Sequence, residues 1–96
     1  MTSAFEWDEA KRRATLSKHG IDFADVTDLF DLPHIVVQSD RGAETRYVAI
    51  GRLNSRFVAV VYTVRGGVVR IITARRARDG EIRAYHQSYP GGGPLS

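Results

Sequence analysis

The chain has 96 residues, a formal net charge of +3 and no cysteine. This length suits one domain with a single core, and a composition of 43% hydrophobic and 26% charged residues is typical of a soluble globular protein. The absence of cysteine excludes disulfides and thiolate metal sites. No apolar run approaches the roughly 20 residues that cross a bilayer, and the N-terminal residues lack the basic and apolar regions of a signal peptide. We therefore expect a cytoplasmic protein without a membrane partner.

The N-terminal third of the sequence predicts a short strand and two helices. Residues 5–7 form the strand, and Asp8 is a suitable N-cap for a first helix that ends at Gly20. Apolar residues at helical spacing predict a second helix that opens at Asp22. Pro33 ends that helix, because proline disfavours helical backbone in the residue before it.

Four segments rich in β-branched and aromatic residues follow, separated by short breaks that contain turn residues. They are residues 34–39, 44–50, 57–64 and 68–73. Residues 77–87 predict a third helix, and the Gly- and Pro-rich residues 89–96 predict a flexible tail. Short connections force neighbouring strands to run antiparallel. The expected fold is α+β: one domain over residues 1–88, with a meandering antiparallel sheet and its two N-terminal helices and one C-terminal helix on one face.

Basic residues gather in the C-terminal half of the chain. From Arg41 onward there are ten arginines and three acidic residues, and four of these arginines, Arg70, Arg75, Arg76 and Arg78, lie close together. A guanidinium matches the geometry of a phosphate and keeps its proton, so we expect an anion-binding edge that takes an RNA backbone. Side chains alternate along a strand, so only one of Arg75 and Arg76 can share a face with Arg70. Parity predicts Arg76.

Candidate proton carriers lie at two helix ends. Lys18 and His19 occupy the predicted last turn of the first helix, where a positive charge also complements the helix dipole. Glu81 is a candidate general base, although a glutamate in the first turn of a helix is also an ordinary cap. Tyr85, one turn later, either stacks on a base or packs on the sheet. Arg46, within a predicted strand, is a further candidate phosphate ligand.

Two blocks of residues stand out by their order and spacing. The first is Phe5-Glu6-Trp7-Asp8, Lys11, Lys18-His19-Gly20-Ile21 and Phe23. The second is Arg46-Tyr47, Ile50-Gly51, Val60-Val61-Tyr62-Thr63, Arg70-Ile71-Ile72-Thr73-Ala74-Arg75-Arg76-Ala77, Glu81 and Tyr85. Together they resemble the BrnT family of type II toxins over residues 4–86. The sequence departs from the family pattern at Thr15, where Asn is usual, and at Thr73, where Ser is commoner.

The resemblance implies a RelE-like fold and a toxin that blocks translation by cleaving RNA. It also implies a cognate BrnA-like antitoxin with a DNA-binding part, through which the complex would repress its own operon. Operator DNA would then be contacted only indirectly. The leading hypothesis is an endoribonuclease in which the 2′-hydroxyl attacks the adjacent phosphate, with arginines holding that phosphate and a second group managing protons.

The residues assigned to the reaction are Lys18, His19, Arg46, Arg75, Arg76 and Glu81. Those assigned to RNA binding are Arg70, Arg78 and Tyr85. No spacing of histidines and carboxylates indicates a metal site, so we expect neither metal nor cofactor. Two alternatives remain open: a non-catalytic nucleic-acid-binding module that uses the same arginines for electrostatic affinity, and an interaction protein whose basic surface docks an acidic partner.

Overall fold

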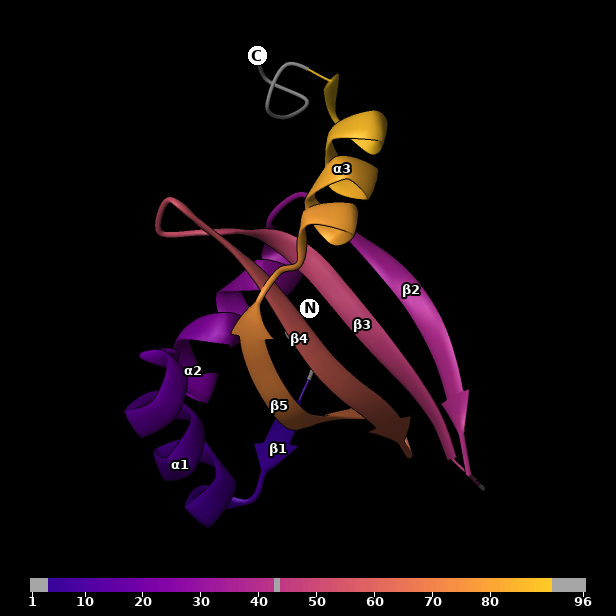
Figure 1. Ribbon diagram of the computed structural model, residues 1–96. Coiled ribbons are helices and arrows are strands. Elements are labelled where there is room, and N and C mark those ends of the chain that lie inside the picture. The colour runs from indigo at the N-terminus through magenta and orange to yellow at the C-terminus, as the bar shows by residue number, and fades with distance from the viewer. Residues whose placement is uncertain (1–3, 43, 91–96) are drawn as a thin grey trace.

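A computed structural model describes residues 4–42 and 44–90 of the chain, which form one sheet and its flanking helices (Figure 1). The elements are β1 (Phe5–Trp7), α1 (Glu9–His19), α2 (Phe23–Val26), the 3-10 helix η1 (Thr27–Asp31), β2 (His34–Arg41), β3 (Glu44–Leu53), β4 (Arg56–Arg65), β5 (Val68–Arg76) and α3 (Asp79–Ser88). Among the described residues, no helix has the length and hydropathy needed to cross a bilayer. The expected α+β class is confirmed.

Helix α1 begins and ends at the residues that the sequence predicts. The Asp8 carboxylate accepts hydrogen bonds from the backbone N–H groups of Ala10 and Lys11, at 2.8 and 3.2 Å. Gly20 adopts a φ of 69°, and its N–H donates to the carbonyl of Leu16. The expected second helix consists of two elements. The α-helix α2 ends at Val26, and the chain continues in the tighter 3-10 winding of η1.

The sheet has the strand order β1-β5-β4-β3-β2. Strands β2 to β5 form the expected antiparallel meander. Strand β1 pairs with β5 in parallel, with Phe5 opposite Val69 and Trp7 opposite Ile71, so the sheet is mixed. The parallel pairing is possible because α1, α2 and η1 lie between β1 and the meander and return the chain to the same end of the sheet.

The helices cover both faces of the sheet, so the prediction that they pack on one face is wrong. Phe23 of α2 packs in a core that includes Ala49, whereas Tyr85 of α3 packs against Ile50 and Ala59. Ala49 and Ile50 are neighbours in β3, and neighbouring side chains of a strand point to opposite faces. Figure 1 shows α1 and α2 beside β1 and β5, and α3 at the end of the sheet that β5 reaches. Helix α3 covers only part of its face.

Tyr89, which the sequence places in the expected tail, contacts the fold. The Tyr89 ring lies 5.0 Å from that of Tyr85, and the Tyr89 hydroxyl donates a 3.2 Å hydrogen bond to the carbonyl oxygen of His34. The flexibility expected of residues 89–96 stays a prediction. Residues 91–96 of that prediction lie outside the described residues.

Candidate active site

A β-bulge in β5 decides which arginines share a face of the sheet. Val61 of β4 pairs with Thr73 of β5, but the next residue, Tyr62, pairs with Ile71. Ile72 is therefore the extra residue of β5 at this point and has no partner in the register. One extra residue reverses the alternation of side chains between the two ends of the strand.

Arg75, not Arg76, lies on the same face as Arg70. In the register Arg70 is opposite Thr63 and Arg75 is opposite Ala59, and these two residues of β4 point to one face. The prediction by parity is wrong because it assumes an uninterrupted strand. Arg76 is exposed and points to the other face of the sheet.

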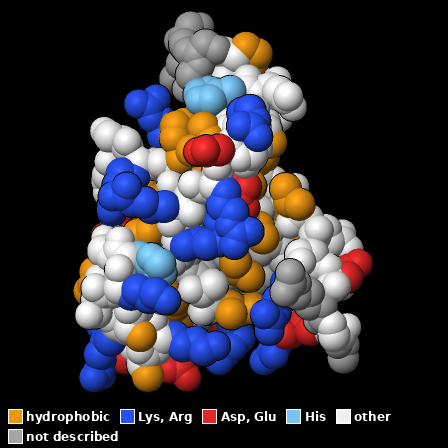
Figure 2. Space-filling model, viewed as in Figure 1, with side chains coloured by type: hydrophobic (Ala, Val, Ile, Leu, Met, Phe, Trp, Pro, Cys, Tyr) orange, Lys and Arg blue, Asp and Glu red, His pale blue; other side chains and the backbone are white. Residues whose placement is uncertain are grey.

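A cavity of about 350 Å³ opens on the part of the sheet that α3 leaves uncovered. We call it the arginine pocket. Its lining residues are Ser39, Arg46, Val48, Val61, Ile72, Thr73, Arg75, Arg78 and Glu81. Figure 2 shows Lys and Arg side chains gathered over the sheet below α3. With three guanidiniums and one carboxylate, the lining carries a net positive charge that suits an anion.

Glu81 is held in place by Arg75 and by the backbone of Arg78. Its two carboxylate oxygens accept hydrogen bonds from the two terminal nitrogens of Arg75, at 2.8 and 2.9 Å. One oxygen also accepts the backbone N–H of Arg78 at 2.8 Å. The hydrogen bonds from Arg75 lower the pKa of Glu81, and the same pairing raises the pKa of Arg75. Glu81 is therefore an ionised hydrogen-bond acceptor, and a weak base.

Arg46 lines the pocket and has a buried Nε donor without a partner among the described residues. It lies in β3 opposite Ser39 of β2. A buried donor without a partner costs about 1–3 kcal/mol. In the lining of the arginine pocket, the Arg46 guanidinium adds positive charge.

The other expected site residues lie outside the pocket lining. Lys18 is exposed and His19 is half-buried in the last turn of α1, and neither lines the arginine pocket. Arg70 shares the pocket's face but pairs with Glu6, with a nitrogen–oxygen distance of 2.9 Å. The structure thus brings together Arg46, Arg75, Arg78 and Glu81 of the sequence-predicted residues.

The sequence allows Tyr85 either to stack on a base or to pack on the sheet, and in the structure it packs on the sheet. Its side chain is 2% exposed, and its ring meets that of Phe57 edge to face with centroids 5.3 Å apart. A base has no free ring face on which to stack. Tyr85 therefore fixes α3 on the sheet, and α3 in turn carries Glu81 to the pocket.

Sequence reasoning missed Ser39 and Thr73, which also line the pocket. Ser39 reaches the site because the β2–β3 hairpin places it opposite Arg46. The signal was the short connection around Asp40–Gly42, which fixes the hairpin register once its turn is known. Across the residues that the structure describes, no three His, Asp or Glu side chains are grouped so that they could hold a metal ion.

Residues 7–81 match the family model described as the ribonuclease toxin, BrnT, of type II toxin-antitoxin systems. The chain is also similar to the Brucella abortus ribonuclease toxin, BrnT, whose crystal structure is known at 1.1 Å resolution. The two chains are 35% identical with a TM-score of 0.66, and the match covers 81% of this chain and 100% of that one. No curated protein matches the sequence. All four charged residues of the arginine pocket lie within the segment that matches the family.

Proposed function

The chain belongs to the BrnT family of ribonuclease toxins of type II toxin–antitoxin systems, and we propose that the arginine pocket is where it cleaves RNA. The observation that carries this proposal is the pair of guanidiniums from β3 and β5. Arg46 and Arg75 both line the pocket, and Arg75 is fixed there by two hydrogen bonds with Glu81. Preorganised donors around one cavity are what a phosphate group requires.

In the proposed reaction, the 2′-oxygen of a ribose attacks the neighbouring phosphorus and the 5′-oxygen of the next nucleotide leaves. The products are a 2′,3′-cyclic phosphate and a 5′-hydroxyl. Negative charge builds up on the phosphate oxygens in the transition state, where Arg46, Arg75 and Arg78 stabilise it. Because the guanidiniums supply this positive charge, we propose that the reaction needs no metal ion.

We assign Glu81 to the positioning of Arg75. Its oxygens already accept three hydrogen bonds, and its lowered pKa makes it a weak acceptor for the 2′-hydroxyl proton. Since neither Lys18 nor His19 lines the pocket, the attacking hydroxyl loses its proton to solvent and the leaving oxygen gains one from solvent. Catalysis then comes mainly from electrostatic stabilisation by the arginines.

Membership of a type II system implies an antitoxin partner and RNA targets. We propose that the antitoxin is BrnA-like and that it inhibits by covering the arginine pocket, whose charge would attract an acidic segment. Operator DNA would be bound through the antitoxin, and the toxin would act in the cytoplasm, where its RNA substrates are.

The test is cleavage of RNA by the purified protein in EDTA, comparing the wild type with Arg46→Ala. Arg83→Ala is the matched control, because Arg83 is an exposed arginine of α3 that does not line the pocket. We expect Arg46→Ala to lose about 10²- to 10³-fold in rate at an unchanged melting temperature, and Arg83→Ala to cleave like the wild type.

Two results would contradict the proposal. Equal cleavage by Arg46→Ala and wild type would remove the arginine pocket from the reaction. Cleavage by the wild type that EDTA abolishes and added Mg²⁺ restores would overturn the metal-free mechanism.

A further inference from the structure

A second hollow adjoins the arginine pocket on the other side of β5. This α1–β5 groove, of about 360 Å³, is lined by Lys11, Ala14 and Thr15 of α1 and by Ile72 and Thr73 of β5. Ile72 and Thr73 also line the arginine pocket. The two hollows therefore lie on either side of these two residues, at the bulge of β5.

Among the described residues, no strand pairs with the outer edge of β5 beyond Ile71. The pairing of β1 with β5 ends at Trp7 and Ile71, whereas β5 continues to Arg76. Beyond Ile71, β5 has a strand neighbour on one side only, namely β4. The small side chains of Ala14 and Thr15 on the facing helix leave room beside this open edge.

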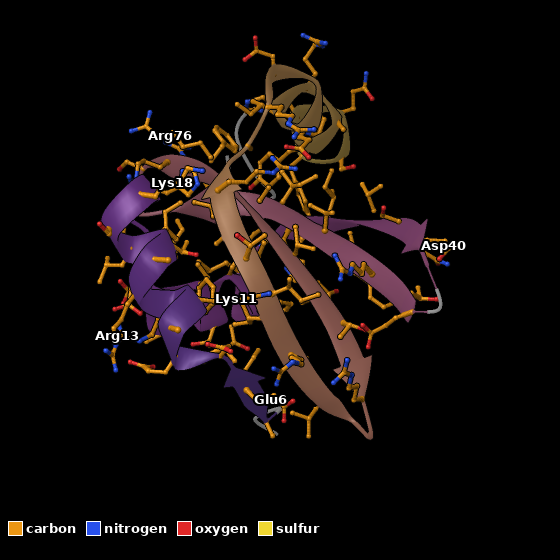
Figure 3. All side chains as sticks on the ribbon, turned by 60° about the horizontal axis from the view of Figure 1, so that its bottom comes forward. Glu6, Lys11, Arg13, Lys18, Asp40 and Arg76 are labelled. Atoms are coloured by element: carbon orange, nitrogen blue, oxygen red, sulfur yellow. The ribbon has the colours of Figure 1, made fainter. Side chains whose placement is uncertain are left out.

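The helix side of the groove is basic. Lys11 and Lys18 are seven residues apart in α1, which places them on one helix face about 10 Å apart along the axis. In Figure 3 Lys11 points from α1 toward β5, whereas Arg13 points away from the sheet. Among the described residues neither lysine forms an ion pair, while Arg13 lies 3.6 Å from a carboxylate oxygen of Glu9.

We propose that the α1–β5 groove binds the backbone of single-stranded RNA next to the scissile phosphate, with Lys11 and Lys18 as phosphate ligands. This inference rests on the proposed function of the arginine pocket. The strand would enter that pocket, cross β5 at the bulge and continue along α1. A single strand fits this path because in-line attack by a 2′-hydroxyl requires a backbone freed from regular duplex geometry.

The groove suits an anion, and the two residues that it shares with the arginine pocket favour the RNA proposed for that pocket over an acidic protein segment. Its lining contains one lysine, two small α1 side chains and two side chains of the open edge of β5, and none of these is acidic. Unpaired backbone groups of a strand edge can meet the edges of bases, and lysines provide point charges for phosphates. Because the groove adjoins the pocket proposed for the scissile phosphate, the RNA strand would run from that pocket into the groove.

The experiment measures binding of a 2′-O-methyl oligoribonucleotide of about ten nucleotides, which cannot be cleaved because its attacking hydroxyl is blocked. Dissociation constants over a range of salt concentrations are compared for the wild type, Lys11→Gln and Arg13→Gln. Arg13→Gln removes the same charge from the same helix on the side away from β5. We expect Lys11→Gln to weaken binding about five- to tenfold and to reduce the slope of log K against log salt by about 0.7, and Arg13→Gln to change neither.

Equal binding by Lys11→Gln and wild type, with an unchanged salt slope, would overturn the proposal. So would weaker binding of the antitoxin at unchanged RNA affinity, which would make the groove a protein interface. Arg46→Ala is measured in parallel for cleavage of a dinucleoside monophosphate, which is too short to reach the groove. If Arg46→Ala is inactive there and Lys11→Gln has normal RNA affinity, the groove inference fails alone. If Arg46→Ala still cleaves, the proposed active site fails.

Discussion

The Glu81 carboxylate binds the Arg75 guanidinium through both of its oxygens, at 2.8 and 2.9 Å. The two side chains are 21% and 23% exposed, so water screens this pair less than it screens an ion pair at the surface. The pair also joins α3 to β5, because Glu81 lies in the first turn of the helix. The orientation of a phosphate-binding group is thereby tied to the docking of α3.

We expect Glu81→Gln to reduce RNA cleavage without removing an ionisation from the pH–rate profile. The substitution keeps one oxygen acceptor but loses the charge that orients Arg75. A general base would contribute an acidic limb that disappears in the Gln variant. If Glu81 only positions Arg75, wild type and Glu81→Gln give profiles of the same shape between pH 5 and 8, at different heights. Disappearance of such a limb would show that Glu81 accepts the proton.

The same ion pair predicts a pH-dependent difference in stability. The pKa of Glu81 is lowered from 4.5 in the folded state by its hydrogen bonds with Arg75. The stabilisation is therefore fully present above pH 4.5 and is lost as the pH falls through the lower, folded-state pKa. The free energies of unfolding of wild type and Glu81→Gln, obtained from thermal melts, should differ by about 1–3 kcal/mol at neutral pH and converge below pH 4.5. A constant difference at all pH values would mean that the pair does not control the titration of Glu81.

The bulge at Ile72 predicts unequal roles for two adjacent arginines. Arg75 lines the arginine pocket, whereas Arg76 is exposed on the opposite face. We expect Arg75→Ala to lower kcat for a dinucleoside monophosphate about a hundredfold and Arg76→Ala to change it little. Melting temperatures of both variants provide the control, because Arg75→Ala also removes the ion pair with Glu81. The double variant Arg75→Ala/Glu81→Gln separates the loss of stability from the loss of activity. We expect it to regain stability relative to Arg75→Ala but not to regain activity.

The sequence predicts the parts of this fold that depend on local signals. The capping residues Asp8 and Gly20 locate α1, and the turn residues between the strands indicate the meander. The face that α3 covers depends instead on which side of β3 offers space to Tyr85, and no local pattern encodes this. Similarly, the parallel pairing of residues 5–7 depends on the path of the helices that follow them.

The candidate site was predictable in composition but not in geometry. Arg46 and Arg75 are residue types that bind phosphate, and Glu81 alone provides too few ligands for a metal ion. Their grouping depends on the unpaired Ile72, and a β-bulge leaves no clear mark in a run of β-branched residues. Strict alternation therefore places Arg76, and not Arg75, on the face of Arg70, although both are assigned to the reaction. The catalytic reading of His19 depends on the resemblance to the family, since the residue taken alone also suits the helix dipole, and its place at the end of α1 sets it outside the pocket lining.

Gly51 is required for the contact between β3 and η1. A Cβ atom at this position would lie 2.7 Å from Cδ1 of Leu29 and 3.0 Å from the backbone oxygen of Pro33. Leu29 is fully buried, so it cannot swing into solvent to make room. We expect Gly51→Ala to destabilise the fold by about 1–3 kcal/mol in chemical denaturation. Gly80→Ala is the control, because its Cβ would lie 3.7 Å from Arg83 and alanine favours helix.

We expect Arg46 to support RNA cleavage while lowering the stability of the free protein. Its buried Nε has no acceptor among the described residues, and an unpaired buried donor is destabilising in the free protein. Arg46→Met keeps most of the aliphatic length and removes the donor. We expect this variant to melt at the same or a higher temperature than the wild type, with a gain of up to about 1 kcal/mol, while its RNA cleavage falls by about 10²-fold or more.

Two further measurements make the Arg46→Met comparison decisive. Inorganic phosphate should raise the melting temperature of the wild type more than that of Arg46→Met, since only the wild type has the Arg46 guanidinium in the pocket lining. Arg46→Lys restores the charge without the Nε donor, so it should recover part of the phosphate effect and little of the activity. A large loss of stability in Arg46→Met would instead mean that Arg46 serves the fold.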